Sequence, residues 1–472
     1  MVYDVIVIGS GLGGLICARQ LAQAGRSVLV LERQAQPGGC LQSYRRGNIE
    51  FDTGLHYVGG LAEGQPLHDD FQKLGLMRLP WHRLDADGFD LITIGGQTFP
   101  MAEGYERFAA MLSDYFPHEK DAIKRYAKML EHLPSIAEIG GVGAYDYLNS
   151  LFRDPMLLNV VSGPAMKMEL RCESLPLFNF AHGMSSYIQS SWRLRGSGRL
   201  IVDSLVSDIK GFGGEIVCKA EVNELIEQGG KIVAAKCSNG ETYEASVFVS
   251  DVHPQLTFSW LKESNMLKGI FRRRINALEN TFGMFTASLV LKPDVLPYFN
   301  HNKYVYRKPN VWTFHNDISC VGGVMISCRV PEDGEYARQI DLLTPMSWTL
   351  CKTWEGTSVG HRDQGYEQQK DNLANECIQL AEMVIPGLRH MIEKTFTSTP
   401  LTWRDYTLSP FGSAFGIRKD YRQPLLTMLS PKTPIPNLFL TGQSLVLHGL
   451  EGVTKTAFNT LDEIEKIEKI NS

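Results

Sequence analysis

The sequence lacks a long hydrophobic run: no stretch reaches about eighteen apolar residues, the length that a helix needs to span a bilayer. Its beginning, Met1 to Asp4, precedes only a short apolar run at Val5 to Ile8, with no cationic start and no small-residue cleavage site. We therefore expect a cytoplasmic protein without a signal peptide, which can touch the inner face of a membrane from one side only.

Paired cysteines and basic clusters are also lacking. The nine cysteines are odd in number, scattered, and never form a C-x-x-C pair, so neither a disulfide framework nor a metal site is predicted. The formal net charge is -5 and no long run of lysine and arginine occurs, so nucleic acid is not an expected partner. The sequence shows no internal repeat and no low-complexity tract.

The composition is that of an ordinary globular protein. Hydrophobic residues make up 43% of the chain and charged residues 21%, which argues against disorder, a collagen-like repeat or a coiled coil. At 472 residues the chain exceeds the size at which one hydrophobic core keeps growing. Two or three packed units are therefore expected.

The start of the chain has a pattern typical of a dinucleotide-binding βαβ unit. An apolar strand is expected at residues 3–8, followed by the G-x-G-x-x-G sequence of residues 9–14, which opens a helix over residues 12–24. A second strand is expected at residues 27–31, and it ends at Glu32. A glycine-rich turn alone is weak evidence, but here strand, helix, strand and acidic residue follow in the required order.

Each part of this pattern has a physical task. Gly9 makes the tight turn, Gly11 lets the backbone approach a pyrophosphate, and Gly14 lets the helix pack closely on the strand. The helix N-terminus offers free N–H groups to phosphate. The carboxylate of Glu32 is expected to accept the ribose hydroxyls of an adenosine, and it disfavours an additional phosphate there. The alternative, a purely structural turn, is the weaker interpretation.

Further segments carry a resemblance to a known family. They are Gly38-Gly39-Cys40, the loop Phe51-Asp52-Thr53-Gly54-Leu55-His56-Tyr57, Asn437 to Gln443, and Gly449 to Val453. Together they resemble the flavin amine oxidase and phytoene desaturase superfamily, and most of all its branch of carotenoid isomerases and retinol saturases, in which a D-x-G-x-H-Y loop follows the glycine pair. The resemblance touches both ends and the middle of the chain.

This resemblance implies an α/β fold in which two domains interleave. An FAD-binding, Rossmann-like domain of the glutathione reductase type is expected from residues 1–60, 196–255 and 431–472, and an α+β substrate-binding domain from residues 61–195 and 256–430. The cofactor implied is FAD. The chain has no second G-x-G-x-x-G for a nicotinamide cofactor, so the electron donor or acceptor stays open.

The residues expected to bind FAD lie in these same segments. They are Gly9, Gly11, Leu12, Gly13, Gly14, Glu32, Arg33, Gly38, Gly39, Cys40, Gly54, Leu55, His56, Val222, Gly442, Gln443, Gly452 and Val453. For Cys40, a small residue packed against the cofactor is the favoured interpretation over a reactive thiol.

The resemblance also implies an apolar small-molecule substrate, such as a polyene or isoprenoid. Saturating a carbon–carbon double bond takes a hydride and a proton, so an acid must lie near the flavin. The candidates are His56, Tyr57 and Glu451. Each has a structural alternative: His56 holds the loop, Tyr57 forms a packing wall, and Glu451 caps the last helix. The aromatic residues within 175–192 and 403–415 are expected to be core or to line a substrate tunnel.

Two other functions and one surface property stay open. An amine or amino-acid oxidase would need a site for a charged substrate, and a relative of Rab GDP-dissociation inhibitors would bind prenylated partners without flavin. The second is disfavoured because Glu32, the glycine pair and the segment at Gly442 are all present. The apolar and basic cluster within 255–285 is favoured as a core-facing helix with a solvated edge, over peripheral contact with a membrane.

Overall fold

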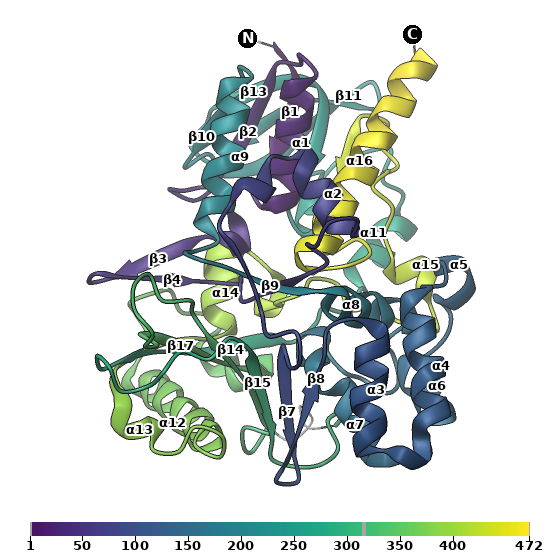
Figure 1. The fold of residues 1–472 in the computed structure, drawn as a ribbon. Helices are drawn as coiled ribbons and strands as arrows, with labels where there is room; N and C mark the ends of the chain where they lie inside the picture. The colour runs from purple at the N-terminus through teal and green to yellow at the C-terminus, as the bar shows by residue number, and fades with distance from the viewer. Residues whose placement is uncertain (1, 314–317, 472) are drawn as a thin grey trace.

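The computed structural model describes residues 2–313 and 318–471, and its upper half in Figure 1 is built on a seven-stranded sheet. The strand order is β10-β2-β1-β13-β12-β11, with β19 paired to β13. The strands are β1 (Val2–Ile8), β2 (Val28–Glu32), β10 (Glu215–Cys218), β11 (Val222–Gln228), β12 (Lys231–Cys237), β13 (Thr242–Ser250) and β19 (Leu438–Leu440). Three widely separated stretches of chain thus share one sheet.

Strand β1 lies at the centre of this sheet, parallel to both β2 and β13. Its side chains alternate between two cores: Val5 and Val7 pack with helices α1 (Leu12–Gln23), α9 (Arg199–Gly211) and α16 (Gly449–Asn471), whereas Ile6 and Ile8 face the opposite side. A continuous apolar strand is what burial on both faces requires. The βαβ unit predicted for the first residues is confirmed.

A second seven-stranded sheet forms the lower half of the molecule in Figure 1. Its order is β18 (Ile392–Ser398), β14 (Gly283–Leu291), β17 (Gln339–Met346), β16 (Gly323–Cys328), β15 (Asn302–Tyr306), β7 (Asp90–Ile94) and β8 (Gln97–Met101). Helix α12 (Gln364–Ala381) packs on one side of it. The other side is covered by helices that include α3 (Tyr105–Tyr115), α4 (Lys120–Glu131), α6 (Ala144–Leu151), α7 (Pro155–Ser162) and α8 (Leu177–Gln189).

Smaller elements lie between the two large sheets. A three-stranded sheet joins β5 (Val58–Gly59), β9 (Ser191–Leu194) and β6 (Trp81–Arg83), and a hairpin joins β3 (Ser43–Arg46) to β4 (Ile49–Asp52). In Figure 1, β9, α8 and α14 (Pro400–Thr407) lie in this middle layer. The remaining α-helices are α2 (Pro66–Lys73), α5 (Ile136–Ile139), α10 (Pro254–Ser259), α11 (Gly269–Asn276), α13 (Leu388–Met391) and α15 (Pro424–Thr427).

Glycine and proline residues shape two further parts of the fold. The turn at Gly229 and Gly230 joins β11 and β12 as an antiparallel hairpin, and both glycines have positive φ. The segment 103–133 contains two helices, α3 and α4. The break follows Phe116, because Pro117 cannot continue a helix.

The D-x-G-x-H-Y loop is anchored by its first residue. The Asp52 carboxylate accepts the backbone N–H of Gly198 at 2.8 Å, at the start of α9, and pairs with the Arg329 guanidinium at 2.5 Å. Both side chains of this ion pair are buried or nearly so, with exposures of 5% and 17%. Asp52 therefore ties the beginning of the loop to both halves of the molecule.

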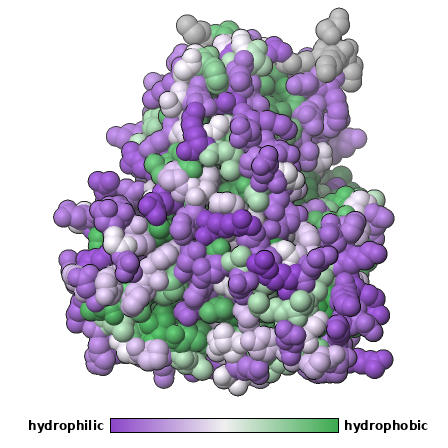
Figure 2. Space-filling view, viewed as in Figure 1, coloured by the Kyte–Doolittle hydropathy of each residue, from purple (hydrophilic) through white to green (hydrophobic). Residues whose placement is uncertain are grey.

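The surface is largely polar on the face drawn in Figure 2. Within residues 255–285, Phe258, Trp260 and Leu261 are buried in the core, as favoured from the sequence, whereas Ile270 is 71% exposed. No helix in the described part of the chain is both long and apolar enough to cross a bilayer.

Candidate functional site

A cavity of about 720 Å³ runs between the two large sheets. It is lined by the glycine-rich loop, the D-x-G-x-H-Y loop, α8, α14 and the first turn of α16. All three candidate catalytic residues line it, and so do the expected cofactor-binding residues, except Gly14. The chain therefore brings together in one space residues predicted separately from its two ends.

The glycines of this cavity are required by close backbone contacts. A Cβ added to Gly14 would lie 2.3 Å from the carbonyl oxygen of Gly9, which explains why Gly14 packs behind the cavity rather than lining it. A Cβ on Gly39 would lie 2.9 Å from Cα of Gly11. The Gly38 N–H donates to the Ser10 carbonyl at 3.0 Å, so the second glycine pair rests directly on the first loop.

Glu32 is fixed at the end of β2 with its carboxylate in the cavity wall. One carboxylate oxygen accepts the Ser10 N–H at 3.0 Å and the Ser10 hydroxyl, and the other accepts the Gln34 N–H at 2.7 Å. The side chain is buried, with 7% exposure. This rigid carboxylate at the edge of the cavity is suited to accept hydroxyl donors.

Asp251 is a half-buried acid that was not expected from the sequence to belong to the site. It follows β13, and its carboxylate accepts backbone N–H groups of Gly11 and Gly14. A Cβ on Gly11 or on Gly442 would lie 2.4 Å from its oxygens. Burial raises the pKa of Asp251 to about 7. The available signal was its place at the end of a strand parallel to β1, where α/β sheets bind ligands.

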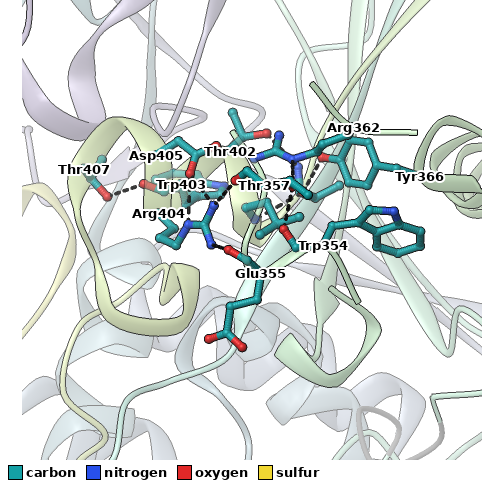
Figure 3. Close-up of polar contacts among 12 residues, drawn as sticks. Trp354, Glu355, Thr357, Arg362, Tyr366, Thr402, Trp403, Arg404, Asp405 and Thr407 are labelled. Carbon is teal, nitrogen blue, oxygen red and sulfur yellow. Dashed lines mark hydrogen bonds and ion pairs between the residues drawn. The ribbon is translucent and has the colours of Figure 1, made fainter. Parts of the chain in front are cut away.

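Helix α14 covers the cavity near Glu32, and a network of arginines holds it in place. Figure 3 shows Arg362 and Arg404 converging on Asp405, with Arg404 also donating to the carbonyl of Thr357 at 3.0 Å. From the other side, Arg33 donates to the Asp405 carbonyl at 2.7 Å. The helix thereby places Trp403 in the cavity wall.

The opposite end of the cavity is built around two tyrosines and a lysine. The Tyr57 hydroxyl donates to Asp90 at 2.7 Å and lies 2.9 Å from the Tyr304 hydroxyl. Lys167 Nζ lies 3.7 Å from the ring centroid of Tyr57 and 4.1 Å from that of Tyr187, and it donates to the Tyr187 hydroxyl at 2.9 Å. Lys167 and Asp90 were not anticipated from the sequence, because nothing local marks them.

The three candidate acids differ in their surroundings. Burial, reinforced by the charges of Lys167 and two arginines, lowers the pKa of His56 to about 3, so its imidazole is neutral. The Tyr57 hydroxyl is engaged with Asp90 and its pKa is raised by burial. Burial also raises the pKa of Glu451, whose carboxyl group bonds the Ser186 side chain.

Aromatic residues divide between the cavity wall and the core. Phe178, Tyr187, Trp403 and Phe415 line the cavity, and the Phe415 ring packs on His448 with centroids 4.7 Å apart. Other apolar residues of 175–192 are core: Leu177, Phe180, Met184 and Ile188 are at most 2% exposed. Burial raises the pKa of Cys40 to about 12, so it carries a neutral thiol.

The cavity fits an adenine dinucleotide. The cavity reaches Gly11, Gly13 and Gly442 beside the N-terminus of α1, where a Cβ would lie 2.4 to 2.7 Å from the Asp251 carboxylate oxygens, so glycine keeps this wall of the cavity narrow. The Asn179 side chain is 7% exposed and lines the cavity; its Oδ1 has no hydrogen-bond partner among the described residues. A buried acceptor of this kind calls for a donor from a ligand.

Comparisons with known proteins agree with this geometry. Residues 7–74 match the family described as NAD(P)-binding Rossmann-like domain. Human all-trans-retinol 13,14-reductase is 25% identical over 96% of this chain and 84% of its own length. A chloroplastic prolycopene isomerase from an Oncidium hybrid is likewise 25% identical, over 97% of this chain and 82% of its own.

Solved structures share the fold over nearly the whole chain. An oxidoreductase from Methanosarcina mazei superposes with a TM-score of 0.69 at 15% identity, covering 97% of this chain and all of that one. A putrescine oxidase with redesigned cofactor binding gives a TM-score of 0.67 at 13% identity, covering 98% of this chain and 99% of that one. The chain is thus an enzyme with a Rossmann-like α/β fold, homologous to all-trans-retinol 13,14-reductases and prolycopene isomerases.

Proposed function

We propose that this chain is an FAD-dependent oxidoreductase that acts on an apolar polyene or isoprenoid-like substrate. The observation that carries the proposal is the single cavity in which a dinucleotide cradle, ending at Glu32, is continuous with a chamber walled by Phe178, Tyr187 and Phe415. The relatives described above act on retinol and on prolycopene, both of which are polyenes. We also propose the interleaved domain boundaries given above, which the mixing of distant strands in each sheet supports.

Within this proposal the residues have distinct tasks. The Gly11 loop and the N-terminus of α1 hold the pyrophosphate, and Glu32 holds the ribose. Gly452 and Val453 line the cavity in the first turn of α16, where backbone N–H groups favour negative charge. When bound, FAD would supply two-electron transfer to or from a substrate carbon.

Among the candidate acids, Glu451 suits proton transfer best. Its raised pKa keeps more of the carboxyl group protonated at neutral pH, and its Ser186 partner fixes its position. The neutral imidazole of His56 and the engaged hydroxyl of Tyr57 are better suited to shape the wall than to donate a proton.

An amine oxidase is the second candidate, because putrescine oxidase shares the fold. Lys167 argues against it. Two aromatic rings in the chamber already face the Lys167 ammonium, so a protonated amine would meet a like charge there instead of an open aromatic cage.

The proposal is tested on the purified protein. The flavin absorption bands of the protein as isolated, and FAD released by denaturation, are the first expected results; a colourless protein that does not take up FAD would contradict the proposal and favour a prenyl-binding protein. The flavin is then reduced anaerobically and mixed with polyenes, and reoxidation with formation of a saturated or isomerised polyene is expected. Peroxide release with amines, without any polyene reaction, would support an amine oxidase.

We further propose peripheral contact with an anionic membrane, through which an apolar substrate would enter. Ile270 of α11 is 71% exposed and Leu425 of α15 is 87% exposed, and Arg274 joins the two helices by donating to the Leu425 carbonyl at 2.8 Å. We expect the protein to sediment together with vesicles that contain phosphatidylserine. The double variant Ile270→Ser, Leu425→Ser is expected to stay in the supernatant. Equal sedimentation of both would contradict the contact.

A further inference from the structure

Two half-buried lysines, Lys419 and Lys167, differ in their surroundings. The ammonium of Lys419 donates to three backbone carbonyls, those of Thr427, Ser444 and Leu445, at 3.0, 2.7 and 2.9 Å. Lys419 is thus fully satisfied by the chain, since an ammonium has three donors. For Lys167, in contrast, the Tyr187 hydroxyl at 2.9 Å is the one oxygen that accepts from the ammonium within residues 2–313 and 318–471.

The nearest buried carboxylate does not pair directly with Lys167. Asp90 accepts the Tyr57 hydroxyl at 2.7 Å and the Asn302 amide at 2.8 Å, and no ion pair within 4.0 Å joins it to Lys167 among the described residues. The Tyr57 ring, 3.7 Å from the ammonium, faces Lys167 while its hydroxyl reaches Asp90. The Lys167 ammonium therefore has two ring faces and one charge at a distance around it, and these do not offset its burial, which lowers the pKa of Lys167 to about 7.

This ammonium belongs to the wall of the chamber. Lys167 lines the cavity beside Met168, Phe178 and Phe415, and its side chain is only half-buried because the cavity reaches it. A cation in an apolar wall is unfavourable unless its donors are met, and hydrogen bonds to a charged group are worth more than neutral ones. An oxygen brought by a ligand would meet this requirement, whereas a hydrocarbon would leave it unmet.

We propose that Lys167 binds the oxygen-bearing end of an elongated apolar ligand, a carboxylate more tightly than a hydroxyl, so that the substrates are oxygen-terminated polyenes rather than hydrocarbons. This inference rests on the proposed function, because it assigns a substrate class to the same chamber. Retinol, the substrate named for one group of relatives, ends in a hydroxyl group. The inference therefore favours a substrate of the retinol type over one of the prolycopene type. The Tyr187 hydroxyl, fixed by Lys167, completes the polar end of the chamber.

The test measures equilibrium binding to the flavin-loaded protein, with the quenching of tryptophan fluorescence as the signal. Three probes share one polyene skeleton: all-trans-retinol, the corresponding carboxylic acid, and the corresponding hydrocarbon without oxygen. We expect the acid to bind at least about tenfold more tightly than the hydrocarbon, with the alcohol between them. Lys167→Met and Lys167→Gln are expected to remove this difference while they keep the affinity for the hydrocarbon.

A matched control is Lys303→Met. Lys303 is half-buried on β15, lies 5.1 Å from the Phe299 ring centroid, and is outside the cavity, so the preference for the acid is expected to persist. Equal affinities of the wild-type protein for acid and hydrocarbon would overturn the inference even if neither Lys167 variant folds. A preference for the acid that survives in a folded Lys167→Met variant would also overturn it. Binding of none of the probes would overturn the proposed function itself.

Discussion

The substitution Glu32→Ala tests the dinucleotide cradle, because it separates two roles of one carboxylate. Glu32 accepts three hydrogen bonds from the chain, two from Ser10 and one from Gln34, and it also lines the cavity. Alanine leaves the fully buried Ser10 N–H without this acceptor. The half-buried Gln34 N–H can donate a hydrogen bond to water instead. A buried donor left unpaired costs about 2 kcal/mol, so we expect a modest loss of stability of that size.

The effect on FAD should be larger than the effect on the fold. Charge-assisted hydrogen bonds contribute about 1.5 to 3 kcal/mol each, so losing a carboxylate that we propose to accept the ribose hydroxyls should cost about 3 kcal/mol or more. Because about 1.4 kcal/mol is tenfold in affinity, FAD should bind at least about a hundredfold more weakly. Glu32→Gln, which keeps the shape and removes the charge, should fall between alanine and the wild type.

Both quantities are measurable on the same preparations. FAD content after gel filtration and the dissociation constant from flavin fluorescence report binding, and urea denaturation of the flavin-free protein reports stability. Glu215→Ala is the matched control, since Glu215 is an exposed acid on β10 of the same sheet, bonded only to Tyr3 among the contacts that the structure describes. Wild-type FAD affinity in Glu32→Ala would refute the assignment of Glu32 to the ribose.

Three further predictions follow from contacts in the same site. Gly442→Ala should lose most bound FAD, because its Cβ would lie 2.4 Å from Asp251, whereas Gly240→Ala, with the same φ of +90° and open space around it, should retain FAD at similar strain. Asp52→Ala should destabilise the protein by about 3 kcal/mol in urea denaturation, since it leaves the half-buried Arg329 without its carboxylate; an effect below about 1 kcal/mol would contradict this role. The pKa of Asp251 is raised from 3.8 to about 7 in the folded protein, so the folded state holds this proton more tightly than the unfolded state. The free energy of unfolding should therefore fall as the pH rises from 4 to 7. In urea denaturation, Asp251→Asn should show a weaker dependence on pH over this range than the wild type.

The βαβ unit at the start of the chain could be predicted from the sequence because its signals are local. The run of apolar residues in β1, the glycines that follow it and Glu32 at the end of β2 lie within one continuous segment, and the glycines have a backbone requirement that few other residues meet. The hairpin at Gly229 was predictable for the same reason. Periodicity and turn chemistry act over a few residues, and there the sequence is most informative.

The end of the cavity that is formed by Lys167, Tyr187 and Tyr57 could not be predicted in this way. Lys167 lies on a short 3-10 helix, Gly163–Met168, Tyr187 lies on α8, and Asp90 begins β7. No spacing links them, and only the packing of the second sheet against α8 brings them together. A lone lysine in a sequence is usually a solvated surface residue, so its burial is a property of the tertiary structure.

The D-x-G-x-H-Y loop is held at both ends by buried side-chain contacts. Asp52 fixes its start to α9 and Arg329, and the Tyr57 hydroxyl fixes its end to Asp90 and Tyr304 of the second sheet. Two buried anchors on opposite sides hold the loop between the sheets, and such satisfied networks make a wall rigid. His56 between them lines the cavity as a neutral ring. The polar residues of the motif therefore fix this part of the cavity wall, and the ring of Tyr57 faces Lys167, the residue that we propose selects oxygen-bearing ligands.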